Sequence, residues 1–252
     1  MPDTVLEAEH LTKIFTSGKK SFTAVDDVSF TVKKGKCLGI VGESGSGKST
    51  IAKLLTRLLD TSEGKITLLG EDITHVKGKK LREVYQKMQM VFQMPGESFD
   101  PRRTLGDGIG EGLRNLGLGR QETRKKVEEL LITCGLTPEF ASRYPHEVSG
   151  GQCQRAAIAR ALAVDPELLI CDEATSSLDV TVQGQIIRLL SELKDSRNLS
   201  FIFISHDIAL VQLFCDEVLV LYQGRVTEMG TPDEIINHPK TDYTRRLIDS
   251  VL

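Results

Sequence analysis

Apolar and polar residues alternate along two early stretches of the chain, residues 5–15 and 24–32. Val28, Phe30 and Val32 fall on one side of an extended backbone, because successive side chains of a strand point to opposite faces. This period of two, repeated in neighbouring stretches, is typical of strands with one buried face. The pattern predicts an antiparallel strand region at the N-terminus.

Short uninterrupted apolar runs follow further along the chain and predict additional strands. Leu168–Cys171 and Phe201–Ser205 are apolar enough to be buried on both faces, as in a parallel sheet. The remaining predicted strand segments are Cys37–Val41, Ile66–Leu69, Met88–Phe92 and a hairpin over Val218–Met229 that turns at Gln223-Gly224.

Helical spacing of apolar residues separates these strands. Lys48–Leu59 and Gln152–Val164 predict helices, and Asp165-Pro166 ends the second of them. An amphipathic helix follows from Val182, Ile186, Leu189, Leu190 and Leu193.

The hydrophobic pattern changes between about Thr104 and Arg143, where apolar residues take helical spacing among charged ones. Val127, Leu130 and Leu131 form a helical stripe there, which predicts a helical insertion and not a continuation of the sheet. The fold class is therefore α/β, with an antiparallel N-terminal piece and a helical insert.

Composition narrows the class of protein. The chain has 252 residues, of which 40% are hydrophobic, enough for one domain and conceivably two. A formal charge of −3 argues against nucleic acid as a partner. The apolar runs are too short to cross a bilayer, and the acidic start does not predict a signal peptide. No C-x-x-C pair occurs, so we expect reduced, mostly buried thiols of a cytosolic protein at Cys37, Cys134, Cys153, Cys171 and Cys215.

Residues 42–49 match the phosphate-binding pattern G-x-x-x-x-G-K-[ST] at every fixed position. A predicted strand precedes the match and a predicted helix follows it, which disfavours an accidental glycine-rich turn. We expect Lys48 to reach the β- and γ-phosphates of ATP and Ser49 to bind Mg²⁺, with Thr50 a weaker candidate. The predicted cradle consists of Gly42, Glu43, Ser44, Gly45, Ser46, Gly47, Lys48 and Ser49.

Two adjacent carboxylates, Asp172 and Glu173, follow the apolar strand Leu168–Cys171. Charges at the end of a buried strand are costly unless cations or hydrogen bonds meet them. Mg²⁺ would satisfy Asp172, and Glu173 could polarise an attacking water. A solvated strand end is the alternative interpretation.

A second helix N-terminus suited to an anion lies at Ser149, Gly150 and Gly151, just before Gln152. Alone, this segment would be interpreted as a flexible turn. In chain order, however, the sequence contains Gln93, Val148–Gln152, Leu168–Glu173, Ser176–Asp179 and Ser205–Asp207.

This succession resembles the nucleotide-binding subunit of ABC transporters across the whole chain. Val148 stands where that family usually has leucine and Ser177 where it has alanine, and neither is a catalytic position. The resemblance implies one domain over residues 1–252, a P-loop NTPase core with a mostly parallel sheet and an antiparallel N-terminal β subdomain. Residues 1–93 and 155–252 would form the RecA-like core, and about 94–154 the helical signature subdomain.

The resemblance also implies roles for single residues. Gln93 would sense Mg²⁺ and water and couple to the membrane partner. Asp179 would cross a dimer interface, and His206 would contact the γ-phosphate, although a lone histidine is more often an ordinary polar residue. The signature that closes over the γ-phosphate of an opposing subunit would comprise Ser149, Gly150, Gly151 and Gln152.

An aromatic ring stacks on adenine in this family. Phe15 occupies the matching position, Phe22 is the other candidate, and a core phenylalanine is the alternative interpretation of Phe15.

Two segments resemble one group within the family, the oligopeptide, dipeptide and nickel importers. Gln93–Thr104 is similar to the "QDP…S-x-NPR-x-T" segment of that group, with departures at Met94, Gly96, Phe99 and Asp100. His238-Pro239 and Tyr243–Leu247 are similar to its tail, although Tyr243–Leu247 could equally be a plain amphipathic helix.

The resemblance implies a separate ATPase subunit of a bacterial importer, peripheral to the cytoplasmic face of the inner membrane. Its partners would be two transmembrane permease subunits, an extracytoplasmic substrate-binding protein and a second ATPase subunit, with a heterodimer favoured over a homodimer. The cofactors would be ATP and Mg²⁺. The alternative is a regulatory ATP-binding module without a transport role.

Overall fold

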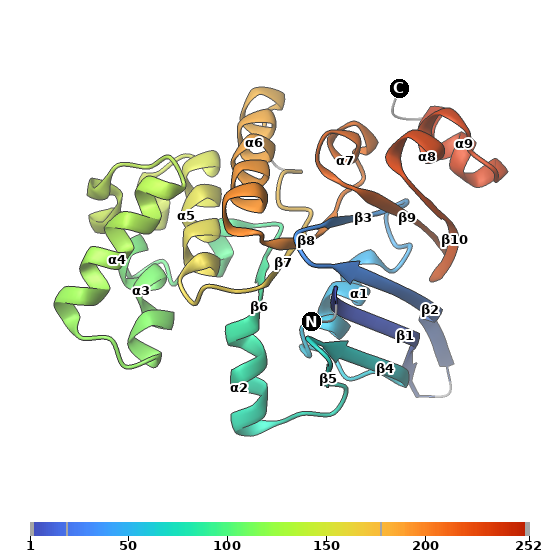
Figure 1. Ribbon diagram of the computed structural model, residues 1–252, viewed down its shortest axis with the longest axis horizontal. Coiled ribbons are helices and arrows are strands. Elements are labelled where there is room, and N and C mark those ends of the chain that lie inside the picture. The colour runs from blue at the N-terminus through green and yellow to red at the C-terminus, as the bar shows by residue number, and fades with distance from the viewer. Residues whose placement is uncertain (1–2, 19, 177, 250–252) are drawn as a thin grey trace.

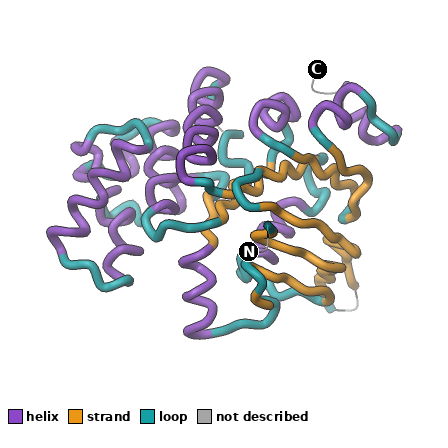
Figure 2. Tube along the Cα trace, in the orientation of Figure 1, coloured by secondary structure: helices purple, strands orange, loops and turns teal. Residues whose placement is uncertain are grey.

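Two β-sheets and a group of helices make up the computed structural model, which describes residues 3–18, 20–176 and 178–249 (Figure 1). Ser177 lies outside the described residues. The N-terminal sheet, the main sheet and the helical insertion occupy successive parts of the molecule, and Figure 2 shows strands and helices largely segregated. The α/β class expected from the sequence is confirmed.

The N-terminal sheet is antiparallel, with strand order β2-β1-β4-β5. Val28, Phe30 and Val32 are buried while their neighbours are exposed, as the alternation predicts. The strands are β1 (Thr4–Ser17), β2 (Lys20–Lys33), β4 (Glu63–Leu68) and β5 (Glu71–Asp72).

The main sheet has the order β10-β9-β3-β8-β7-β6. Strands β9, β3, β8, β7 and β6 run parallel, and only β10 is antiparallel to its neighbour. The carboxyl ends of the parallel strands therefore meet at one edge of the sheet. The strands are β3 (Cys37–Val41), β6 (Met88–Val91), β7 (Leu168–Asp172), β8 (Ser200–Ile204), β9 (Glu217–Tyr222) and β10 (Arg225–Gly230).

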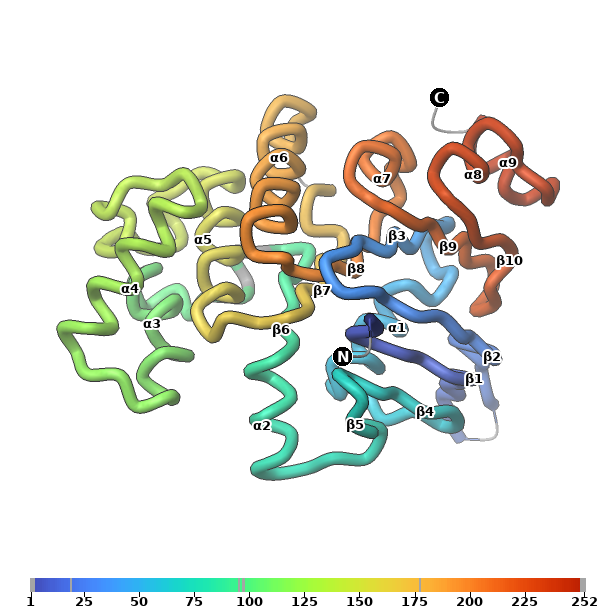
Figure 3. The backbone as a smooth tube through the Cα atoms, viewed as in Figure 1, coloured from blue at the N-terminus to red at the C-terminus, as the bar shows by residue number. Residues whose placement is uncertain are grey.

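Helices cover the main sheet and build the insertion. Helices α3, α4 and α5 pack on one another beyond β6, as Figures 1 and 3 show on the left of the molecule. The helices are α1 (Lys48–Leu55), α2 (Gly78–Lys87), α3 (Leu105–Asn115), α4 (Arg120–Thr133), α5 (Gly150–Leu162), α6 (Val180–Arg197), α7 (Ile208–Phe214), α8 (Pro232–Asn237) and α9 (Asp242–Asp249), with 3-10 turns at Pro95–Ser98, Pro138–Ser142 and Pro145–Glu147.

Apolar and polar residues do not alternate along β7, because both faces of this strand are buried. Leu168 and Ile170 pack into the core between the two sheets, whereas Leu169 and Cys171 pack into the core under the helices. Both faces of the strand are therefore apolar, as expected for a strand inside a parallel sheet. The five cysteines are free and buried, which agrees with the predicted thiols.

Some element boundaries differ from expectation. The helix predicted over Lys48–Leu59 ends at Leu55, because Arg57 adopts a left-handed backbone (φ 59°) that cannot continue a helix. Helix α5 begins at Gly150, two residues before the prediction, because Ser149 caps it. The sequence pattern does not predict helix α2, since its apolar side is short, with Leu81, Val84 and Tyr85, and only Val84 of these is fully buried.

The division of the chain into core and helical subdomain stays a prediction. Its expected boundary near residue 154 falls inside α5.

Candidate nucleotide site

The P-loop connects β3 to α1 in a conformation that depends on glycine. Gly47 precedes α1 with φ 108°, and a Cβ atom there would lie 2.4 Å from the carbonyl oxygen of Ala24. Gly42 has φ 153°, and a Cβ atom there would lie 2.2 Å from the carbonyl oxygen of Leu221. A side chain at Gly42 would push the loop away from β9, and one at Gly47 would push it away from β2.

Lys48 points back into the loop. Its Nζ donates to the carbonyl oxygens of Gly42 at 2.7 Å and Glu43 at 2.9 Å, and the residue is only 4% exposed. Burial lowers the pKa of Lys48, while the charges of Glu173, Asp172 and Glu43 oppose that shift. The ammonium group is thus held where a phosphate could reach it.

The Ser46 hydroxyl oxygen is buried in the same loop without a hydrogen-bond partner among the described atoms. An unpaired buried hydroxyl inside a glycine-rich cradle fits a site built for an anion, since burial without a partner is unfavourable. Gly45, at the tip of the loop (φ 80°), has no described atom within 4 Å of a built Cβ. The cradle is therefore open on that side.

Asp172 and Ser49, the two predicted metal ligands next to the P-loop, lie in contact. The Ser49 hydroxyl donates to Asp172 Oδ1 at 3.0 Å. Burial raises the pKa of Asp172, and the hydrogen bond from Ser49 partly opposes this shift. Strand β7 thus places a carboxylate oxygen beside the start of α1.

Three more of the predicted site residues lie close together at Glu173, the residue that follows Asp172. Gln93 Nε2 donates to Glu173 Oε2 at 2.9 Å, and His206 Nδ1 lies 3.9 Å from the same oxygen. Gln93 follows β6, Glu173 follows β7 and His206 follows β8, which are adjacent parallel strands. The strand order therefore explains why residues so distant in sequence meet.

Ser176 also belongs to this cluster, although the sequence analysis assigns it no chemical role. Its hydroxyl lies 3.4 Å from Gln93 Nε2 and donates to the carbonyl of Glu173. The sequence signal that could have found it is its place at the start of the Ser176–Asp179 motif, three residues after Glu173.

The signature residues form a helix cap. The Ser149 hydroxyl accepts from the Gln152 N–H, and the Gln152 side chain accepts from the Ser149 N–H, which is a reciprocal capping box. A Cβ atom on Gly151 would lie 2.6 Å from Val182 Cγ1, so α5 packs closely on the start of α6. The exposed N-terminus of α5 keeps the partial positive charge that an anion requires.

Asp179 likewise caps a helix, accepting from the Val182 N–H at 3.0 Å. None of the hydrogen bonds or ion pairs found in the described part of the chain joins residues 149–152 to residues 42–50. The signature instead lies against the segment that leads into α6, where Gly150 and Gly151 approach Leu178 and Val182.

Phe15 and Phe22, the two adenine candidates, are direct cross-strand partners in β1 and β2. Phe15 is 41% exposed, with Lys13 Nζ 5.3 Å from its ring centre, and Phe22 is 64% exposed. Exposure of both rings excludes the core interpretation of Phe15, but the choice between them stays a prediction.

The family is established by comparison. The ABC transporter family model matches residues 25–176. This chain belongs to the ABC transporter family and is an ABC-type ATPase.

Relatives of known role extend the match. The chain is 44% identical over 254 residues to the oligopeptide transport ATP-binding protein OppF of Bacillus subtilis, covering 100% of this chain and 83% of that protein. It is 45% identical over 239 residues to OppF of Salmonella typhimurium, covering 94% of this chain and 72% of that protein.

Two solved structures of ATP-binding cassette proteins are similar to this chain in fold. A dimeric, post-hydrolysis structure of the ATP-binding cassette MJ0796 bound to ADP and Pi has a TM-score of 0.83 at 28% identity, covering 90% of this chain and 98% of that one. CbiO1 from Clostridium perfringens, part of the transporter complex cbiONQ, has a TM-score of 0.83 at 30% identity, covering 94% of this chain and 92% of that one.

Proposed function

We propose that this chain is the ATP-hydrolysing subunit of a bacterial importer for di- or oligopeptides. The observation that carries the proposal is the 44% identity over the full chain to an oligopeptide transport ATP-binding protein. Nickel or another metal chelate is the second cargo class that the sequence suggests, but the relatives described above carry oligopeptide names. These names also disfavour a purely regulatory module.

The proposed reaction follows from the geometry. Lys48 would place its charge against the β- and γ-phosphates, and the amides of the P-loop would surround their oxygens. Glu173 would orient the attacking water. Gln93, which is hydrogen-bonded to Glu173, would sense whether that water is bound. His206, whose Nδ1 lies 3.9 Å from the same carboxylate oxygen, would contact the γ-phosphate.

Mg²⁺ fits the same edge of the sheet. The Ser49 hydroxyl, the Asp172 carboxylate and the Gln93 amide offer oxygen ligands, and Mg²⁺ retains several waters, so few protein ligands are needed. Within residues 3–18, 20–176 and 178–249 no group of three or more His, Cys, Asp or Glu side chains forms a closed metal site. When bound, Mg²⁺ would neutralise charge that develops on the phosphates.

Asp172→Asn tests this ligand assignment. The amide keeps the shape and the contact with Ser49 but loses the negative charge, so we expect the Mg²⁺ concentration for half-maximal ATPase to rise at least about tenfold. The measurement is phosphate release against Mg²⁺ concentration, with Asp195→Asn on exposed α6 as the control. An unchanged Mg²⁺ dependence would remove Asp172 from the site.

A second ATPase subunit would complete the site. The P-loop precedes α1 and the signature precedes α5, so the chain has two helix N-termini suited to an anion, and a nucleotide could bridge the P-loop of one subunit and Ser149–Gly151 of another. Asp179 would then lie at the interface. The dimeric state of MJ0796 with ADP and Pi supports this arrangement, and a mixed pair of ATPases is favoured over two copies of this chain.

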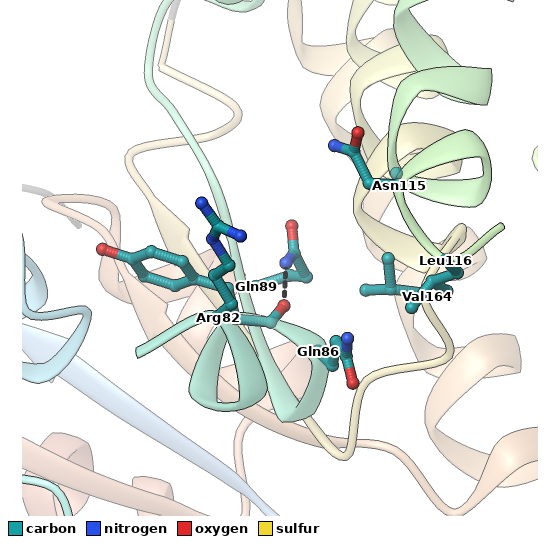
Figure 4. A pocket seen from close by; sticks show the side chains of 8 residues that line it. Arg82, Gln86, Gln89, Asn115, Leu116 and Val164 are labelled. Atoms are coloured by element: carbon teal, nitrogen blue, oxygen red, sulfur yellow. Dashed lines mark hydrogen bonds between the residues drawn. The ribbon is translucent and has the colours of Figure 1, made fainter. Parts of the chain in front are cut away.

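The membrane partner would dock beside the Gln93 loop. A hollow of about 470 Å³ lies between α2–β6 and the end of α3, with Arg82, Gln86 and Gln89 opposite Asn115, Leu116 and Val164 (Figure 4). An adjoining hollow includes the exposed apolar side chains of Leu58 and Phe92.

Phe92 directly precedes Gln93, so a permease helix bound there would touch the loop that contacts Glu173. No helix in the described ranges is long and apolar enough to span a membrane itself. We propose two permease subunits and an extracytoplasmic binding protein as partners, with this chain on the cytoplasmic face, because the relatives are transport ATP-binding proteins.

Gene deletion tests the cargo class. We expect loss of this chain to reduce uptake of a labelled tripeptide to background, because no ATP hydrolysis would drive the permeases. Wild-type chain supplied from a plasmid should restore uptake, and Lys48→Ala should not. A deletion that impairs uptake of nickel or sugar while peptide uptake continues would contradict the peptide assignment.

A further inference from the structure

The C-terminal helix α9 contacts the P-loop through one side chain. The hydroxyl oxygen of Tyr243 accepts a hydrogen bond from the Glu43 N–H at 3.0 Å, across a separation of 200 residues. The Tyr243 hydroxyl itself lies 3.5 Å from the carbonyl oxygen of Leu221, at the end of β9. Nothing in the reaction proposed above uses this contact.

The Glu43 N–H belongs to the same peptide group as the Gly42 carbonyl, which accepts from Lys48 Nζ at 2.7 Å. A peptide group is planar, so its N–H and C=O point in opposite directions and turn together. Tyr243 therefore holds one end of the peptide whose other end holds the Lys48 ammonium group.

Gly42 leaves this peptide little room to shift as a unit. A Cβ atom on Gly42 would lie 2.2 Å from the carbonyl oxygen of Leu221, so the loop packs directly against the end of β9. Rotation of the peptide about its flanking bonds is then the remaining freedom, and the Tyr243 hydroxyl opposes that rotation.

Tyr243 is itself held in place from several sides. Its ring packs on Tyr222, with ring centres 4.2 Å apart. The two residues before α9 are held by β10, because the buried Glu228 carboxylate accepts from the backbone N–H groups of Lys240 at 3.0 Å and Thr241 at 3.3 Å. Further along α9, Leu247 and Ile248 are buried in the core. The hydroxyl is thus a fixed point and not a mobile surface group.

We propose that Tyr243 is a positioning residue for nucleotide binding: its hydroxyl fixes the Gly42–Glu43 peptide and thereby sets the direction of Lys48 toward the phosphates. Its hydroxyl acts on the backbone of the loop and not on the Glu173 carboxylate, so we expect its effect on affinity and not on the chemical step. This inference rests on the proposed nucleotide site and is independent of the cargo.

Tyr243→Phe tests the proposal, because phenylalanine keeps the ring packing and removes only the hydroxyl. We expect the dissociation constant of fluorescent ADP and the KM for ATP to rise about three- to tenfold, the effect of losing one neutral hydrogen bond. The value of kcat should stay within about twofold of wild type. The matched control is Tyr222→Phe, which removes the hydroxyl from the partner ring, where, among the residues that the structure describes, it accepts from the Gln223 side chain.

Melting temperature without nucleotide separates positioning from general stability. We expect Tyr243→Phe and Tyr222→Phe to melt within about 4 °C of wild type, with only the former losing affinity. Equal nucleotide affinity in Tyr243→Phe and wild type would overturn the proposal. So would a loss of affinity that Tyr222→Phe shares. If the nucleotide site itself were misassigned, wild type would not bind fluorescent ADP, which distinguishes that failure from this one.

Discussion

Glu173→Gln is expected to bind ATP, to hydrolyse it at least about 100-fold more slowly than wild type, and to accumulate as a closed dimer. The amide keeps the shape of the side chain and can still accept the hydrogen bond that Gln93 donates at 2.9 Å. It cannot act as a carboxylate base, so the γ-phosphate remains.

The retained γ-phosphate would bridge two subunits, with Lys48 and His206 on one side and the capped N-terminus of α5 on the other. Removing the charge of Glu173 also removes repulsion between this carboxylate and the phosphates, which favours closure. The wild type should close only transiently, because hydrolysis destroys the bridge.

Size-exclusion chromatography with Mg-ATP measures this outcome, with the partner ATPase present if the natural dimer is mixed. Glu192→Gln, on the exposed face of α6, is the control for a lost carboxylate charge. Hydrolysis at the wild-type rate would exclude Glu173 from the mechanism. An inactive variant that stays monomeric with every candidate partner would contradict the two-subunit site.

Lys48→Ala should abolish ATP turnover, with a loss of at least about 100-fold, because it removes the only full positive charge that the P-loop supplies to the phosphates. The structure adds a reason to expect that the chain still folds. The Lys48 side chain is buried and donates to two carbonyls of its own loop, Gly42 and Glu43. Burial already lowers its pKa, so removing the buried charge offsets part of the cost of those lost hydrogen bonds.

Phosphate release at saturating ATP measures the activity, and thermal unfolding without nucleotide checks the fold. We expect a melting temperature within about 4 °C of wild type. Lys125→Ala, on the exposed face of α4, removes the same charge away from the site and should leave turnover unchanged. Wild-type phosphate release from Lys48→Ala would refute the P-loop assignment.

Local pattern was sufficient for most of the elements. The alternation at Val28, Phe30 and Val32 predicts β2, and the uninterrupted apolar run Leu168–Cys171 predicts β7. Each pattern depends on whether one or both faces of the strand are covered. It failed where a helix has almost no buried stripe, as in α2, and where a single backbone conformation at Arg57 ends a helix.

The contiguous part of the site was also readable from sequence, since residues 42–50 act through backbone geometry and spacing that neighbours in the chain impose. Gln93, Glu173 and His206 could be grouped only through the family resemblance. Their meeting depends on the order of β6, β7 and β8 in the sheet, which no local pattern encodes.

The fold class and the phosphate cradle follow from short-range periodicity and one contiguous motif, and the family follows from a succession of short motifs. The folded structure was needed to show that Gln93 and His206 both approach Glu173, that Ser149 and Asp179 also cap helices, and that α9 reaches the P-loop. Tyr243 shows the reason most directly. Its local sequence predicts only an amphipathic helix, whereas its contact with Glu43 depends on how segments 200 residues apart pack against β9.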